Sequence, residues 1–121
     1  MILADTSVWI DHLRNTDPEL FDILQKGEVC IHPFIVGEIA CGNFTNRIEI
    51  IDLLKALPEV FAASDDEVLQ FIENQHLYGK GLGYIDIHLL ASAFINKVKL
   101  WTKDKRLSAV YAELNSNKNI L

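Results

Sequence analysis

The sequence predicts an α/β fold with a central, mostly parallel sheet. Short apolar segments typical of strands alternate with helical segments along the whole chain, which is the pattern of strands joined by helical crossovers. Hydrophobic residues make up 50% of the 121 residues and charged residues 23%, which is ordinary usage for a globular protein and argues against a disordered chain. This length suffices for one hydrophobic core, so we expect a single domain over residues 1–121.

Helix start and stop signals divide the first half of the chain. Thr6 or Ser7 is placed to cap a helix after the first strand, and Thr16 with Glu19 has the spacing of a capping box. Pro58 stops the last helix of this half, because proline cannot continue a helix. We therefore expect strands over 2–4 and 29–31, and helices over 6–14, 16–26, 33–42 and 48–57.

The second half contains the most apolar helix. Ser64 and Glu67 have capping-box spacing, and a glycine-rich segment over 79–83 separates their helix from the next one. The helix that begins at Asp86 is nearly all apolar, so it must be buried. We expect strands over 60–61 and 98–101, and helices over 64–78, 86–95 and 105–114.

The charge balance restricts how this chain can meet a nucleic acid. A net charge of −6 argues against a protein that coats nucleic acid by bulk attraction, since non-specific binding depends chiefly on Lys and Arg at phosphates. A local basic cluster remains, because five of the 11 Lys and Arg residues fall between positions 97 and 106. These are the candidate contacts to a polynucleotide backbone: Lys97, Lys99, Lys103, Lys105 and Arg106.

The chain shows no pattern of export or membrane insertion. Met1 leads directly into an apolar strand without a basic leader, and no run of 18 apolar residues occurs. Cys30 and Cys41 lie in apolar surroundings without C-x-x-C spacing, which is typical of small core residues in a reducing compartment. We expect a cytoplasmic protein with no membrane contact.

Four carboxylates lie in or beside apolar segments. Asp5 and Asp104 follow the first and last strands, whereas Glu38 and Asp86 belong to apolar helices. Ligand sites in α/β sheets form at the carboxyl ends of the strands, where neighbouring helices can add side chains. Because an isolated ionised carboxylate is costly to bury, a shared divalent cation would satisfy all four. Oxygen ligands suit Mg²⁺ or Mn²⁺, and the lack of an adjacent His and Cys set argues against zinc.

A metal ion held by carboxylates suits phosphodiester hydrolysis, because it orients the phosphate, activates water and stabilises charge on the leaving oxygen. We expect Asp5 and Asp86 to be the main metal ligands and Glu38 to be a ligand or general base. Asp104 would hold a second metal ion or a metal-bound water. Hydroxyl groups beside the acids are candidates for orienting a carboxylate or water: Thr6, Ser7 and Thr102.

Four segments resemble, in order, the acidic motifs of PIN-domain ribonucleases, and specifically of VapC-type toxins from bacterial toxin–antitoxin pairs. They are Asp5-Thr6-Ser7, Val36-Gly37-Glu38-Ile39, the segment 81–93 around Asp86, and Leu100-Trp101-Thr102-Lys103-Asp104. The similarity covers essentially the whole chain. Asp104 is followed by Lys105 and Arg106 rather than by the aromatic residue often found near this position.

The resemblance implies a three-layer α/β/α fold and Mg²⁺- or Mn²⁺-dependent endoribonuclease activity on RNA. It also implies a homodimer and inhibition by a cognate VapB-type antitoxin. In the family, Asp5, Glu38 and Asp86 match the acids on which activity most depends, whereas the position of Asp104 varies more. The amphipathic helix over 48–57 is left open as core, dimer surface or antitoxin groove.

Three other function classes compete with a nuclease. A phosphoacceptor receiver domain needs a phosphorylatable Asp at a strand end, whereas Asp52 lies inside an amphipathic helix. A phosphatase of the haloacid-dehalogenase type needs an Asp two places after Asp5, where Ser7 stands. A catalytically silent PIN-like scaffold that only binds a partner is the remaining alternative, and the complete set of four acids argues against it.

Overall fold

The computed structural model describes residues 1–116 and confirms an α/β fold around a parallel sheet. Strand β1 (Ile2–Ala4) lies between β2 (Val29–Cys30) and β3 (Lys99–Trp101) and is parallel to both. Leu3 pairs with Cys30 on one side and with Leu100 on the other. All three carboxyl ends therefore lie at one edge of the sheet.

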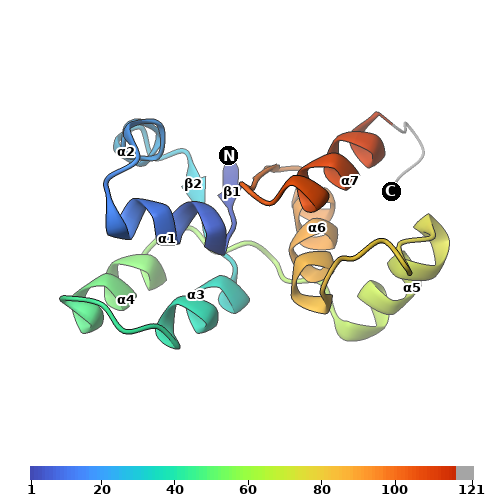
Figure 1. Ribbon diagram of the computed structural model, residues 1–121, viewed down its shortest axis with the longest axis horizontal. Helices are drawn as coiled ribbons and strands as arrows, with labels where there is room; N and C mark the ends of the chain where they lie inside the picture. Colours follow the sequence, from blue (N-terminus) through green and yellow to red (C-terminus); the bar gives the residue numbers. More distant parts are fainter. Residues whose placement is uncertain (117–121) are drawn as a thin grey trace.

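Helices cover both faces of this sheet and complete the three-layer arrangement. Figure 1 shows the first four helices on one side of β1 and the last three on the other. The central position of β1 explains its burial, since Leu3 and Ala4 are fully enclosed between the layers. The helices are α1 (Thr6–Arg14), α2 (Pro18–Gln25), α3 (Pro33–Ala40), α4 (Arg47–Lys55), α5 (Asp65–Gln75), α6 (Tyr84–Asn96) and α7 (Lys105–Asn115).

Two helix caps differ from the sequence prediction. Asp5, rather than Thr6 or Ser7, caps α1, because β1 leaves Asp5 extended and its carboxylate accepts a hydrogen bond from the Val8 amide. Asp17 caps α2 in place of Thr16, and its carboxylate accepts from the first-turn amides of that helix. In both cases a carboxylate next to the expected residue provides the stronger acceptor.

Other boundaries were predicted with mixed success. The capping box of Ser64 and Glu67 is confirmed, but α5 ends at Gln75 because His76 adopts a left-handed conformation with φ 54°. The strand expected over 60–61 is wrong: the chain makes only a single bridge between Ile31 and Glu59 there. Cys30 is buried as expected, whereas Cys41 follows the end of α3 and is exposed.

Burial of α6 is confirmed, and its buried residues include two polar side chains, His88 and Ser92. Ser92 Oγ accepts a hydrogen bond from the Ala63 amide and lies 3.2 Å from His32 Nε2. His32 in turn caps α3 through its Nδ1 atom, which accepts from the Phe34 amide. This polar chain joins three segments across the core.

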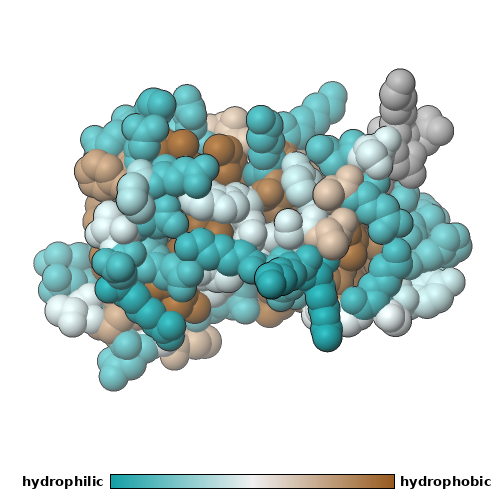
Figure 2. Space-filling model, turned by 45° about the horizontal axis from the view of Figure 1, so that its top comes forward, coloured by the Kyte–Doolittle hydropathy of each residue, from teal (hydrophilic) through white to brown (hydrophobic). Residues whose placement is uncertain are grey.

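The surface is mainly polar. Figure 2 shows hydrophilic side chains over most of the face in view, with hydrophobic ones in separate patches between them. Large exposed hydrophobic side chains include Ile48 and Leu53 on α4, which are 74% and 66% exposed. In the stretch from residue 1 to 116, no helix combines the length and the apolar character needed to cross a membrane.

The buried His32 predicts acid destabilisation. Burial and the neighbouring His88 lower the pKa of His32 from 6.5 to about 4, so the folded protein holds this ring neutral. Its stabilising contribution is present above pH 6.5 and is lost as pH falls toward 4, because the unfolded chain takes up the proton first. We expect the free energy of unfolding to drop by about 2–3 kcal/mol across this range.

Chemical denaturation of wild type and His32→Asn at several pH values measures this contribution. Asparagine can still cap α3, so the variant should fold and lose less stability than wild type on acidification. His76→Asn is the matched control, since His76 is exposed and asparagine tolerates its left-handed backbone. Equal acid sensitivity of wild type and His32→Asn would contradict the assignment.

Candidate active site

Asp5 lies at the carboxyl end of the central strand and is 5% exposed. Its Oδ1 atom accepts from Ser7 Oγ at 2.5 Å and from the Val8 amide at 3.3 Å. Its Oδ2 atom accepts from Thr102 Oγ1 at 2.5 Å. Three donors therefore fix the orientation of this carboxylate, and two of them are the hydroxyls of Ser7 and Thr102 that the sequence singled out.

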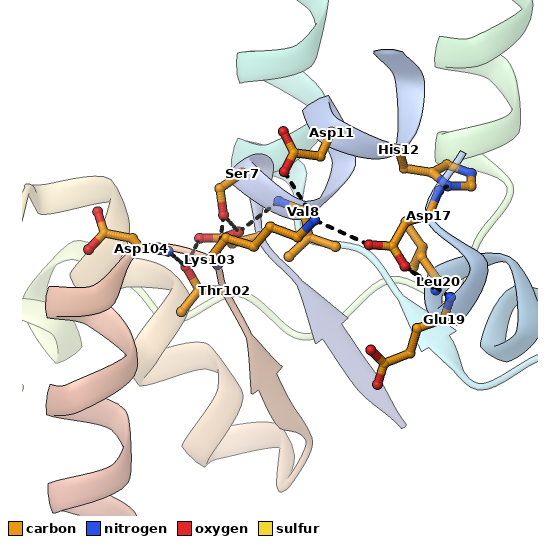
Figure 3. A network of polar contacts seen from close by, with 11 residues as sticks. Ser7, Val8, Asp11, His12, Asp17, Glu19, Leu20, Thr102, Lys103 and Asp104 are labelled. Carbon is orange, nitrogen blue, oxygen red and sulfur yellow. Dashed lines mark hydrogen bonds and ion pairs between the residues drawn. The ribbon is translucent and has the colours of Figure 1, made fainter. Parts of the chain in front are cut away.

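Asp104 lies just beyond the neighbouring strand β3. Its Oδ1 atom caps α7 by accepting from the Arg106 and Leu107 amides at 2.9 and 3.1 Å. Thr102 Oγ1 accepts from the Asp104 amide at 3.0 Å, which connects this residue to Asp5 through one side chain. In Figure 3 the Asp104 carboxylate points away from the side chain of Lys103.

Glu38 comes from the helix layer rather than from a strand end. It is exposed on α3, and its Oε1 atom accepts from Thr6 Oγ1 at 2.7 Å. This bond joins α3 to the first residue of α1, directly after Asp5. Thr6 therefore fixes the orientation of one of the candidate acids.

Asp86 lies in the first turn of α6 and is half-buried. Burial raises the pKa of its carboxyl group, and the negative charges of Asp104, Asp5 and Glu38 raise it further, in that order. A hydrogen bond with the backbone of Gly83 acts in the opposite direction. Asp86 therefore lies within electrostatic reach of the other three acids.

The four acids fit a hard divalent cation by charge and by donor chemistry. Within residues 1–116, no Lys, Arg or His nitrogen forms an ion pair with any of them. Their oxygens are the ligands that Mg²⁺ and Mn²⁺ prefer. In their present rotamers, however, no three His, Cys, Asp or Glu side chains of the described chain meet around one point. Like charges repel, so a cation would have to draw the carboxylates together.

The basic cluster does not act as one patch. Lys97 caps the end of α6 and Lys99 begins β3, so both lie at the opposite end of that strand from Asp104. Lys103 Nζ pairs with Asp11 at 3.0 Å and with Asp17 at 3.2 Å, as Figure 3 shows. The remaining two basic residues of the cluster lie beside the acids and have no such pair within residues 1–116.

Lys105 and Arg106 begin α7 directly after Asp104 and are both exposed. The guanidinium of Arg106 lies over Gly81, where an added Cβ would come within 2.7 Å of its Nη1 atom. Gly81 has a φ of +77°, a conformation that favours glycine. Arg106 therefore bridges the start of α7 and the glycine-rich segment that leads to Asp86.

Sequence reasoning missed Asp11 and Asp17, which hold Lys103 in place. Both come from elements around α1 and α2, 92 and 86 residues before Lys103 in the chain. Hydrogen bonding to the Leu20 amide and the nearby Lys103 lower the pKa of Asp17. The sequence position of Asp17 just before Pro18 indicates a helix cap, which is the role it has at the start of α2. The sequence could not reveal that Lys103 is its distant partner.

Comparison with known proteins identifies relatives over nearly the whole chain. The family described as PIN domain matches residues 2–113. Two curated relatives from Mycobacterium tuberculosis, one from strain CDC 1551 / Oshkosh and one from strain ATCC 25618 / H37Rv, are each named Ribonuclease VapC32. Each is 44% identical over 114 residues, covering 93% of this chain and 92% of the relative.

Proposed function

This chain belongs to the PIN domain family, and on that premise we propose that it is a Mg²⁺- or Mn²⁺-dependent endoribonuclease and the toxin of a toxin–antitoxin pair. The observation that carries the proposal is that none of the four carboxylates, Asp5, Glu38, Asp86 and Asp104, forms an ion pair with a Lys, Arg or His side chain within residues 1–116. The 44% identity to proteins named ribonucleases supports RNA as the substrate. A cytoplasmic location is part of the same proposal.

The proposed roles follow from how each carboxylate is held. Asp5, with its orientation fixed by three donors, and Asp86 would bind the metal ion, which when present polarises the phosphate and activates water. Thr6 donates to Oε1 of Glu38, and within residues 1–116 no hydrogen bond reaches Oε2, so this oxygen can accept a proton from the attacking water. Oδ1 of Asp104 caps α7, and in the part of the chain that the structure describes Oδ2 has no hydrogen bond, so Asp104 would bind a second ion or orient a water molecule through Oδ2.

Incubation of the purified protein with total RNA tests this function. We expect cleavage in the presence of Mg²⁺ or Mn²⁺ and none after chelation by EDTA, because the proposed mechanism depends on the metal ion to polarise the phosphate and activate water. Cleavage that persists in EDTA would contradict a metal-dependent mechanism. Absence of cleavage with either ion would favour the alternative, a catalytically silent PIN-like scaffold.

A VapB-type antitoxin and a second copy of this chain are the proposed protein partners. Ile48 and Leu53 are exposed on α4, so the helix expected over 48–57 is not purely core. A cavity of about 360 Å³ between α1, α2 and α4 adds an apolar surface, lined by Trp9, Leu13, Leu24, Leu53 and Leu57 among others. Apolar patches of this kind are typical of protein interaction sites.

Backbone contacts of the RNA are proposed for the three basic residues nearest Asp104, which are Lys103, Lys105 and Arg106, and charge removal there tests them. In Lys103→Ala with Lys105→Ala, we expect weaker RNA binding and a flatter dependence of log Kd on log salt. The slope should fall by about one unit or less for each phosphate that the variant no longer neutralises. Lys103 would first have to leave Asp11 and Asp17, so Lys105 should account for most of the change.

Fluorescence anisotropy of a labelled single-stranded RNA across a salt series measures the slope. Lys97→Ala with Lys99→Ala is the matched control, because it removes two charges at the far end of β3. An equal change of slope in both double variants would contradict a contact surface around Asp104. An unchanged slope in both would remove the cluster from the proposal.

A further inference from the structure

A second cavity, of about 190 Å³, opens directly beside Glu38. Its walls come from α1, from the end of α3 and from the turn that follows α3. We call it the Glu38 pocket, and its lining residues are Ile10, Leu13, Arg14, Glu38, Ile39, Gly42, Asn43 and Phe44. Because Glu38 is itself a wall of the pocket, whatever the pocket binds lies next to the proposed site of cleavage.

The lining has the chemistry of a nucleotide subsite. Phe44 is a half-buried aromatic side chain, and Ile10 and Leu13 add apolar surface from α1. Arg14 and Asn43 are exposed, and within residues 1–116 neither side chain forms a hydrogen bond or ion pair. The pocket thus combines an aromatic face, a free guanidinium and a free amide, which is how proteins bind an unpaired base and its phosphate.

The turn that forms one wall is held in place before any ligand binds. Arg47 donates from its guanidinium to the carbonyl oxygens of Ala40 and Gly42. A Cβ added at Gly42 would lie 3.3 Å from the Ile39 carbonyl oxygen and 3.8 Å from Phe44 Cδ1, so glycine leaves room beside the aromatic ring. Glu38, another lining residue, is held by the hydrogen bond from Thr6. A preorganised wall lowers the entropy cost of binding.

Charge and size favour a nucleobase over a protein side chain. The four carboxylates make the neighbouring surface negative, and Arg14, with Arg47 behind the turn, supplies local positive charge for a phosphate. The volume is below the roughly 300 Å³ at which pockets for drug-sized ligands begin, so it suits a single ring system. A base paired in a duplex cannot leave its stack to enter such a pocket without unpairing.

We propose that the Glu38 pocket binds the base of one nucleotide next to the scissile phosphate, and that its lining residues set a base preference at that position. Phe44 stacks on the base, Asn43 hydrogen-bonds its edge, and Arg14 binds an adjacent phosphate. The inference rests on the proposed ribonuclease function and adds the residues that determine which base is preferred.

Cleavage of a randomised single-stranded oligoribonucleotide pool in Mn²⁺, with sequencing of the cut ends, tests the proposal. We expect wild type to show about a tenfold base preference at one position beside the cut, and much slower cleavage of the same pool annealed to its complement. Asn43→Ala should reduce the preference to less than about twofold. Phe44→Leu and Arg14→Gln should each lower kcat/KM by about tenfold, because they remove the stacking face and the phosphate contact.

Matched controls lie outside the pocket. Asn74→Ala removes an amide on α5, and Phe61→Leu removes an aromatic ring that is 73% exposed, and both should retain the wild-type preference and rate. Thermal unfolding checks whether Phe44→Leu is folded. If this variant is unfolded, the test depends on Arg14→Gln and Asn43→Ala, which change exposed side chains.

The outcomes separate the two proposals. If wild type cuts the pool but all three pocket variants keep its base preference and rate, the pocket assignment is overturned and the ribonuclease function stands. That is also the result expected if a protein side chain occupies the pocket. If wild type cuts no RNA with either metal ion, both proposals fail. Loss of preference in the pocket variants alone supports the inference.

Discussion

Replacement of Asp5 by asparagine is expected to lower RNA cleavage by about a thousandfold or more while the protein stays folded. Asparagine has the same shape, and one of its polar atoms can still accept from Ser7 and the Val8 amide. What the substitution removes is the negative charge that would bind the metal ion at the end of β1. The measurement is the initial rate of RNA cleavage in Mn²⁺, with thermal unfolding to verify folding.

Asp22→Asn is the matched control for this prediction. Asp22 is an exposed carboxylate on α2 that pairs with Lys26 at 3.0 Å, so its removal should leave cleavage unchanged. A rate for Asp5→Asn within tenfold of wild type would contradict the role of Asp5. An equal drop in both variants would point to a general effect of charge rather than to a metal ligand.

The second large effect is expected on stability, through Asp86. Burial and, to a smaller extent, the charges of the other three acids raise the pKa of Asp86, so the folded protein without metal holds its ionised form at a cost. Its stabilising contribution is present below the ordinary value of 3.8 and is lost as pH rises through the raised pKa, because the native state binds the proton more tightly. At neutral pH, Asp86→Asn without metal should therefore raise Tm by roughly 2–5 °C.

A divalent cation should remove the same repulsion in wild type. At a Mn²⁺ concentration about 100 times Kd, binding adds about 2.7 kcal/mol and should raise the Tm of wild type by roughly 10 °C. Asp86→Asn should respond much less, since it has lost a main ligand. Asp52→Asn, an exposed change on α4, should respond as wild type does. An equal Mn²⁺ response in wild type and Asp86→Asn would exclude Asp86 as a ligand.

The positions of two candidate acids followed from the sequence because strand ends are local features. Asp5 and Asp104 were predicted at one edge of the sheet from the apolar residues before them, and parallel pairing of β1 with β3 brings them to the same edge. The position of Lys99 at the amino end of β3 follows from the same register. The sequence alone could have shown that Lys99 and Lys105 lie at opposite ends of this strand. Lys99 lies near the start of the predicted strand and Lys105 follows it, so only Lys105 lies at the carboxyl end, where ligand sites form.

The partners of individual side chains could not be predicted. Thr102 reaches Asp5 across 97 positions of sequence, and Lys103 reaches Asp11 across 92. Such contacts depend on how α1, α2 and β3 pack together, which residue patterns do not encode directly. The cap of α1 was predicted wrongly because Asp5 was considered only as a candidate metal ligand. Its carboxylate accepts hydrogen bonds both from the Val8 amide, as the helix cap, and from the Thr102 hydroxyl.

A crystal structure with Mn²⁺ tests the central claim most directly, because anomalous scattering locates the ion independently of activity. We predict one strong anomalous peak at the carboxyl edge of the sheet, with oxygens of Asp5 and Asp86 about 2.1 Å from it and Glu38 or Asp104 bound directly or through water. A peak elsewhere, or Asp5 and Asp86 oxygens that remain too far apart to share one ion, would contradict the account.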